Sequence, residues 1–304
     1  MEEGGGTGAR LDRSPRRLTD VKTLNIAHRG GRSLAPENTM AAAHKALEAG
    51  ADMWELDVRL TADEQLILIH DDTLVRTSDA RERFPNRHPW RVCDFTLAEI
   101  QTLDCGSWFN REDPFGQIKA GIVSAQDQRS YIGERAPTLR EALEFTRAHD
   151  WRVIVELKAL SDEDKGELMV RKSVALIEEL GMEHRAMLCS FNHDYLRQVR
   201  ALSPRMATAV LTRKAIRHPV RYLTELGAQA YNPWSLVVRA RRVRELRQAG
   251  FDIYVWTVND EKRMRKLIGM GVSGIVTDFP QTLARLLSAD THHIPSNPKH
   301  DTRR

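Results

Sequence analysis

The feature that most limits the fold of this chain is a regular alternation of short apolar runs with amphipathic stretches. The runs are apolar almost throughout and rich in Val, Ile and Leu, which is typical of strands buried on both faces of a parallel sheet. They predict strands at residues 24–28, 52–58, 66–70, 152–157, 186–191, 207–211, 228–232, 252–258 and 274–278.

Stretches of helical period fill most of the intervals between these runs. Two of them stop at a glycine shortly before the next strand, at Gly50 and Gly250, as helix ends commonly do. The strand–helix alternation indicates an α/β fold. The predicted helices occupy residues 39–49, 138–149, 164–180, 193–202, 219–226, 239–249, 260–270 and 280–287.

One interval is too short for a helix. Only residues 59–65 separate the second run from the third, whereas a parallel crossover needs about a dozen residues or more. We therefore predict an antiparallel hairpin, and a two-residue turn at Asp63-Glu64 would place Asp57 opposite His70. Without the returning strand eight parallel strands remain, which predicts a (β/α)8 TIM barrel. An open doubly wound sheet is the alternative.

The chain divides into a central barrel domain and two polar ends. Residues 1–20 and 288–304 are polar and charged, and we expect both to be disordered tails. The barrel domain would span 21–287. Within it, residues 71–137 show no clear alternation, and we expect an insertion that partly covers the site at one end of the barrel.

Composition excludes several classes of protein. Hydrophobic residues make up 41% of the chain and charged residues 29%, which is ordinary for a globular protein. The net charge of +4 comes with arginines spread along the chain, so nucleic-acid binding is not expected. No apolar run reaches the roughly 20 residues of a membrane helix, and no signal peptide is evident, so stable membrane insertion is not expected.

The cysteines indicate a reducing compartment. Cys93, Cys105 and Cys189 match no zinc or redox spacing, and their odd number argues against a disulfide framework. We therefore expect a cytoplasmic protein. The sequence does not predict an oligomeric state.

Three carboxylates lie where strands of the predicted barrel end. Glu55 and Asp57 are two apart on one strand and share a face, and Glu156 ends the next barrel strand. Converging carboxylates are unfavourable without a positive charge between them. Oxygen ligands without cysteine suit a hard divalent cation, so we predict one Mg²⁺ or Ca²⁺. The alternative is that each carboxylate pairs with an arginine or lysine.

Two histidines and two cations reach the same end of the barrel. His28 ends the first strand and His70 ends the hairpin, and two imidazoles can act as general acid and general base. Arg29 and Lys158 would bind an anion and stabilise charge on phosphoryl oxygens. A phosphate ester is therefore the expected substrate.

The motifs around these residues resemble those of the glycerophosphodiester phosphodiesterase family. The resemblance covers about residues 24–287, and the ordered set of motifs is specific although no single motif is. The matching segments are IAHRGG (26–31), PENT (36–39), ELDV (55–58), HDDTLVRT (70–77), LDCGSWF (103–109), IVELK (154–158), VWTVN (255–259) and GIVTDFP (274–280).

The resemblance implies a TIM barrel that hydrolyses glycerophosphodiesters to sn-glycerol 3-phosphate and an alcohol. The glycerol 2-hydroxyl group is the expected attacking group, and the resemblance does not say which histidine acts as base. It implies metal ligands at Glu55, Asp57 and Glu156, an acid/base pair at His28 and His70, and phosphate contacts at Arg29 and Lys158.

Several residues allow two interpretations. Trp256 would form the floor of a glycerol pocket or belong to the barrel core. Asp278 would orient a histidine or a cation, or cap the helix that follows it. Glu37 and Asn38 would support the site or cap a helix. The hairpin turn departs from the Asp-Gly usual in the family, so another turn type and a register shift of one residue remain open.

Two other functions fit parts of the sequence. A lysophospholipase D, or a related phospholipase D-like enzyme, would use the same kind of site, and Trp108 and Phe109 would then form an apolar rim at its mouth. The other alternative is a non-catalytic barrel that binds an anion or lipid. The pair of histidines beside the carboxylates counts against it, since binding alone needs no acid/base pair.

Overall fold

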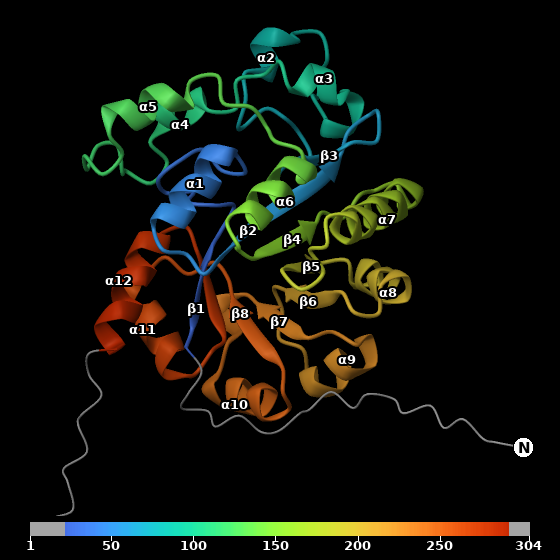
Figure 1. Cartoon of the computed structure of the whole chain (residues 1–304), viewed down its shortest axis with the longest axis vertical. Coiled ribbons are helices and arrows are strands. Elements are labelled where there is room, and N and C mark those ends of the chain that lie inside the picture. The colour runs from blue at the N-terminus through green and yellow to red at the C-terminus, as the bar shows by residue number, and fades with distance from the viewer. Residues whose placement is uncertain (1–21, 292–304) are drawn as a thin grey trace, which may run out of the picture.

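Eight parallel strands close into a barrel in the computed structural model, which describes residues 22–291 (Figure 1). The order around the sheet is β1-β9-β8-β7-β6-β5-β4-β2, and pairing of β1 with β2 closes it. The predicted TIM barrel is therefore confirmed. The barrel strands are β1 (Leu24–Ala27), β2 (Met53–Leu60), β4 (Val153–Leu157), β5 (Ala186–Ser190), β6 (Ala207–Thr212), β7 (Ala230–Pro233), β8 (Asp252–Val255) and β9 (Gly274–Thr277).

Helices surround the barrel and lie close to their predicted positions. The last of them is longer than predicted and continues past residue 287 to Thr291. The rest of the two predicted tails, residues 1–20 and those after 291, lies outside the described residues. The surrounding helices are α1 (Met40–Glu48), α6 (Leu139–Ala148), α7 (Glu163–Glu179), α8 (His193–Leu202), α9 (Pro219–Leu226), α10 (Ala240–Gln248), α11 (Glu261–Gly269) and α12 (Pro280–Thr291).

Local sequence explains where these helices begin and end. The Thr138 side chain accepts a hydrogen bond from the Glu141 backbone N–H, and the Glu141 carboxylate accepts one from the Thr138 backbone N–H, which makes a capping box at the start of α6. Gly227 ends α9 with a φ of 71°, a left-handed conformation that glycine adopts without steric cost.

Alternate residues of β2 face opposite sides of the barrel wall. Trp54 and Leu56 point outward into the apolar layer beneath the helices, where the Trp54 indole N–H donates to the Thr146 hydroxyl at 2.9 Å. Glu55 and Asp57 therefore point into the barrel. The strands are apolar on both faces because the helices cover the outside and a separate apolar cluster fills the inside.

The predicted hairpin is confirmed, but its register is wrong by one residue. β3 (Leu66–Leu68) runs antiparallel to β2, with Val58 opposite Leu68. The Asp57 carbonyl accepts a hydrogen bond from the Ile69 N–H at 3.1 Å, so Ile69 and not His70 lies opposite Asp57.

The turn accounts for this shift. The Thr61 N–H donates to the Gln65 carbonyl at 3.0 Å, which leaves residues 62–64 in the loop. Glu64 has a φ of 59°, the single left-handed residue that a three-residue loop uses. A two-residue type I′ turn would need two such residues, and Asp63-Glu64 offers no glycine for it.

The insertion between residues 71 and 137 forms short helices with apolar cores of their own. Figure 1 shows these helices together at one side of the barrel, beside α1 and β3. One cluster packs Phe95, Ile100 and Leu103 against the hairpin, and another packs Trp108 and Phe109 against α1. The helices are α2 (Ala80–Arg83), α3 (Leu97–Ile100), α4 (Ser107–Glu112) and α5 (Ala125–Tyr131).

Candidate active site

A cavity of about 500 Å³ opens at the carboxyl ends of the barrel strands. Its wall has two chemically different sides. One side is charged and comes from β1, β2, the hairpin and β4: His28, Arg29, Glu55, Arg59, His70, Asp71, Asp72, Glu156 and Lys158. The other is mainly apolar and comes from the remaining strands and the residues that follow them, including Cys189, Phe191, Leu211, Trp256 and Val276.

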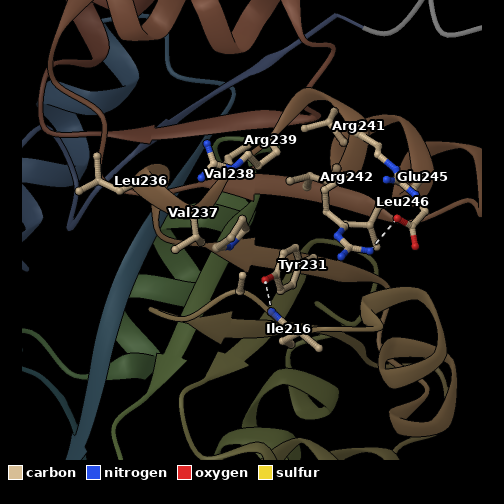
Figure 2. A pocket seen from close by; sticks show the side chains of 14 residues that line it. Ile216, Tyr231, Leu236, Val237, Val238, Arg239, Arg241, Arg242, Glu245 and Leu246 are labelled. Carbon is tan, nitrogen blue, oxygen red and sulfur yellow. Dashed lines mark hydrogen bonds and ion pairs between the residues drawn. The ribbon is translucent and has the colours of Figure 1, made fainter.

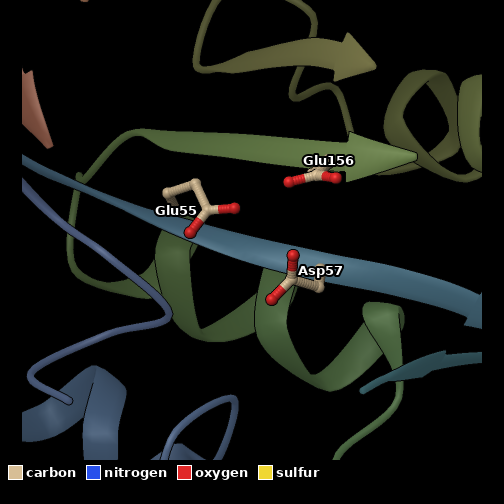
Figure 3. Close-up of side chains that lie close together, drawn as sticks. All are labelled: Glu55, Asp57 and Glu156. Carbon is tan, nitrogen blue, oxygen red and sulfur yellow. The ribbon is translucent and has the colours of Figure 1, made fainter. Parts of the chain in front are cut away.

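The three predicted carboxylates come together at the wall of this cavity, which Glu55 and Glu156 line. Figure 3 shows Glu55 and Asp57 on β2 facing Glu156 on β4, and one oxygen of each lies within 4.8 Å of the others. The residues are only 6%, 1% and 8% exposed. Burial and repulsion from Asp57 and Glu156 raise the pKa of Glu55 well above its usual value. The cluster therefore offers oxygen ligands only, and its negative charge is not fully balanced. Both properties fit a hard divalent cation.

Two cations neutralise part of this charge. The Lys158 ammonium nitrogen lies 2.8 Å from Oδ1 of Asp57 and 2.7 Å from Oε1 of Glu156, and Arg29 Nε lies 3.2 Å from Oδ2 of Asp57. Burial raises the pKa of Asp57, but Lys158 and Arg29 outweigh it and hold this pKa well below its usual value. Glu55 accepts the Arg29 backbone N–H at 3.0 Å and forms no ion pair within residues 22–291. The alternative of simple ion pairing therefore holds for Asp57 and Glu156 but not for Glu55.

His28 is paired with a carboxylate from the last strand. Its Nδ1 lies 2.6 Å from Oδ1 of Asp278, whose Oδ2 accepts a hydrogen bond from Asn259 at 2.7 Å. Burial and the Arg29 charge lower the pKa of His28, so the imidazole is neutral at pH 7. Of the two interpretations of Asp278, the structure supports the one in which it orients a histidine.

His70 is paired in the same way. Its Nδ1 lies 2.6 Å from Oδ1 of Asp71, and Arg76 Nε contacts Oδ2 of Asp71 at 2.6 Å. Arg59 donates two hydrogen bonds, of 3.0 and 2.9 Å, to the His70 carbonyl. His70 still lines the cavity despite the shifted register, because the chain leaves β3 after Leu68 and strand alternation no longer directs its side chain.

Glu37 holds three guanidinium groups in place behind the cavity wall. Its carboxylate pairs with Arg29 Nη1 at 2.8 Å, Arg32 Nε at 3.0 Å and Arg76 Nη2 at 2.6 Å. Burial raises the pKa of Glu37, but these cations outweigh it and lower the value to about 2. The neighbouring Asn38 donates to Oδ2 of Asp57 at 2.8 Å. The predicted supporting positions of Glu37 and Asn38 agree with these contacts.

Trp256 lines the apolar side of the cavity. Its indole N–H donates to the Asn232 carbonyl at 2.7 Å, and its ring meets the Phe191 ring edge to face with centroids 5.5 Å apart. Trp256 also packs against the interior cluster of the barrel, so its place in the barrel core is confirmed, and its role as the floor of a glycerol pocket stays a prediction.

Sequence reasoning did not identify Asp71, Arg59 and Phe191 as parts of the site. Asp71 directly follows His70, so the sequence could have indicated a carboxylate beside this histidine. Arg59 and Phe191 carried none, because their positions depend on where the chain leaves β2 and β5.

A second cavity of about 500 Å³ lies outside the barrel wall, between β7 and α10 (Figure 2). Arginines at the start of α10 and apolar residues line it, and Arg242 pairs with Glu245 at 2.7 Å. No histidine and only one carboxylate are among its lining residues, so it offers no acid/base pair and no cluster of metal ligands.

Between residues 22 and 291, no helix has the length and apolar character needed to cross a membrane.

Comparisons with known proteins agree with this geometry. The model of the glycerophosphoryl diester phosphodiesterase family matches residues 28–282. A glycerophosphodiester phosphodiesterase of Caldanaerobacter subterraneus subsp. tengcongensis is 36% identical over 267 residues, which cover 88% of this chain and 98% of the relative.

Solved structures show the same fold. A phosphodiesterase from Oleispira antarctica, in complex with the product sn-glycerol-3-phosphate, superposes with a TM-score of 0.74 at 27% identity, covering 88% of this chain and 97% of its own. A putative glycerophosphoryl diester phosphodiesterase from Silicibacter pomeroyi gives a TM-score of 0.76 at 26% identity, covering 90% and 95%. The chain belongs to the glycerophosphodiester phosphodiesterase family, as its motifs predicted, and is a phosphoric diester hydrolase.

Proposed function

We propose that this enzyme uses one divalent cation, Mg²⁺ or Ca²⁺, and a pair of histidines to hydrolyse glycerophosphodiesters to sn-glycerol 3-phosphate and an alcohol. The observation that carries the proposal is the meeting of two histidine–aspartate pairs and a buried carboxylate cluster in one cavity. The predicted cytoplasmic location stays a prediction.

Glu55, Asp57 and Glu156 would hold the cation. A divalent cation held there would offset part of the charge of the three carboxylates and would stabilise negative charge on the phosphoryl oxygens. Their close spacing, their burial and the absence of a cationic partner for Glu55 within the described residues support this assignment.

Arg29 and Lys158 would bind the phosphate group. Both line the cavity and both already contact the carboxylate cluster, so a phosphoryl oxygen next to the cation lies within their reach. Glu37 keeps the Arg29 guanidinium in place, which lowers the entropy lost when Arg29 binds an anion.

His28 and His70 would transfer the protons. One imidazole accepts the proton of the glycerol 2-hydroxyl group as its oxygen attacks phosphorus, and the other protonates the oxygen of the leaving alcohol. Water then opens the resulting cyclic phosphate to give sn-glycerol 3-phosphate, with the two imidazoles exchanging roles. Asp278 and Asp71 each contact the Nδ1 of their histidine, which leaves both Nε2 atoms for these transfers.

The lysophospholipase alternative loses the feature that favoured it. Trp108 and Phe109, predicted as an apolar rim, are 4% and 0% exposed and belong to the core of the insertion.

The test is coupled release of glycerol 3-phosphate from glycerophosphocholine, glycerophosphoethanolamine and lysophosphatidylcholine, with Mg²⁺, Ca²⁺ or a chelator. We expect metal-dependent turnover of the first two, and loss of about 10²-fold or more in kcat for His28→Ala and His70→Ala. His44→Ala, on the exposed side of α1, is the matched control. Full activity in chelator would refute the metal, and a wild-type rate for His70→Ala would refute the acid/base pair.

A further inference from the structure

A side chamber of about 580 Å³ adjoins the active-site cavity. The two spaces share three lining residues, Arg59, Asp72 and Ala159, so they lie against the same stretch of wall. The outer walls of the chamber come from the insertion, at residues 91–93, and from the connection between β4 and α7, at residues 159–165.

We propose that this chamber, with Arg91 and Lys165, binds the alcohol part of the substrate and favours an alcohol that carries its own negative charge. The inference rests on the proposed function, since it takes the phosphate to lie at the carboxylate cluster. The glycerol part is small and the same in every substrate, whereas the alcohol varies. The outer walls of the chamber lie outside the barrel. The chamber is therefore suited to bind the alcohol, which is the part of the substrate that varies.

The preference for a negatively charged alcohol rests on the charged side chains that line the chamber. Arg91 and Lys165 form no ion pair with any carboxylate in residues 22–291, although both line the chamber. The other cation, Arg59, already donates to the His70 carbonyl and has Asp72 as its main favourable charge. The unpaired charge in the chamber is thus positive.

The remaining carboxylate in the chamber does not cancel this charge. Oδ1 of Asp162 accepts the backbone N–H of Lys165 at 3.1 Å as the N-cap of α7, and its single negative charge cannot balance the two positive charges of Arg91 and Lys165. Backbone contacts hold Arg91 in place, because Thr73 pairs with Arg91 in a short antiparallel bridge and the Val92 N–H donates to the Asp72 carbonyl at 2.9 Å.

An anion beyond the scissile phosphate can be a second phosphodiester or a carboxylate. Both are probed by comparing kcat/KM for bis(glycerophospho)glycerol, whose alcohol carries a second phosphodiester, and glycerophosphoserine, whose alcohol carries a carboxylate beside an ammonium group, with kcat/KM for glycerophosphoglycerol, whose alcohol is neutral, and glycerophosphocholine, whose alcohol is cationic. We expect at least one of the two substrates with an anionic group on the alcohol to exceed glycerophosphocholine by about tenfold, with the difference shrinking as salt is raised. The anionic substrate that gains identifies the group, and no gain for either would overturn the proposal.

Substitutions in the chamber test the residues. Arg91→Gln and Lys165→Gln should each lower kcat/KM for the preferred anionic substrate by about threefold to tenfold, as loss of one partly screened charge predicts. Turnover of glycerophosphoglycerol should stay within about twofold, and Arg91→Lys should restore the preference. Arg244→Gln, which removes the same charge from the exposed face of α10, is the control and should change neither.

Product inhibition separates the two ends of the substrate. The inhibition constant of sn-glycerol 3-phosphate should be the same in wild type, Arg91→Gln and Lys165→Gln, because the product lacks the alcohol. Weaker inhibition in these variants would place the glycerophosphate end in the chamber and overturn the proposal. If the variants are fully active and keep the wild-type substrate preferences, only the proposed role of the chamber is refuted. If the enzyme turns over none of the four substrates, the proposed function is refuted.

Discussion

His28 and Asp278 meet across the line where the first and last strands of the barrel join. Nδ1 of His28 lies 2.6 Å from Oδ1 of Asp278, although the two residues are 250 positions apart in the chain. They are brought together because β1 pairs with β9, with Ala27 opposite Thr277, and each residue directly follows its strand. The contact selects the ring orientation in which Nε2 faces the cavity.

Replacing this carboxylate should slow the reaction without weakening substrate binding. In Asp278→Asn we expect kcat to fall about 10–100-fold, since loss of the orienting carboxylate misplaces the His28 proton, with KM changed less than about threefold. Steady-state kinetics on glycerophosphocholine measure both constants. Asp150→Asn, at the opposite end of the barrel between α6 and β4, is the control, and an equal effect there would contradict the prediction.

Removing one metal-ligand carboxylate should stabilise the metal-free protein. Glu55 faces Asp57 and Glu156 without an ion pair in the described residues, so Glu55→Gln relieves repulsion and keeps an acceptor for the Arg29 N–H. We expect a rise in Tm of about 2–4 °C in chelator, for about 1 kcal/mol, together with weaker Mg²⁺ or Ca²⁺ binding by calorimetry.

Glu156→Gln provides the contrast for this experiment. Glu156 lies 2.7 Å from the Lys158 ammonium nitrogen, so its replacement also removes an attractive pair. Burial still raises the pKa of Glu156, so we expect the Tm in chelator to rise less than in Glu55→Gln. Equal changes of Tm in the two variants would contradict the charge argument.

Glu37 should make folding stability depend on pH in the acid range. Its folded pKa of about 2 lies below the ordinary value of 4.5, so its stabilising effect is complete above pH 4.5 and is lost as pH falls toward 2. The shift corresponds to about 3 kcal/mol. Urea unfolding should show Glu37→Gln less stable than wild type at pH 7, with the difference shrinking by pH 3.

The control for that series is Glu48→Gln. Glu48 is exposed and pairs with Lys45 within one turn of α1, so we expect a change below about 0.5 kcal/mol at both pH values. A constant difference between wild type and Glu37→Gln from pH 7 to pH 3 would show that the ionised form of Glu37 is not the stabilising one.

The aromatic wall should contribute to substrate binding. Trp256→Ala removes the ring that lines the cavity beside Phe191, and we expect KM to rise about tenfold, as loss of one buried aromatic contact predicts. Trp256→Phe should keep most of the affinity. Trp234→Ala, which removes an exposed tryptophan outside the cavity, should leave KM unchanged and serves as the control.

The strands, most of the helices and the meeting of the predicted site residues at one end of the barrel followed from the sequence. The apolar runs needed only local periodicity, and the short interval after β2 required a hairpin. The register of that hairpin was wrong because it depends on the φ of Glu64, a turn property that residue type alone does not decide. The predicted rim at Trp108 and Phe109 was wrong because an aromatic residue in an irregular segment gives no sign of which neighbour buries it.

The sequence by itself determined the alternation of strands and helices, the hairpin and the grouping of Glu55 and Asp57 on one face, since each depends on residues close together in the chain. Only the tertiary structure decided that Asp278 holds His28, that Lys158 lies between two of the carboxylates, and that a charged side chamber adjoins the site. These contacts join distant segments, and closure of the barrel sets their distances. No local pattern of residues contains that information.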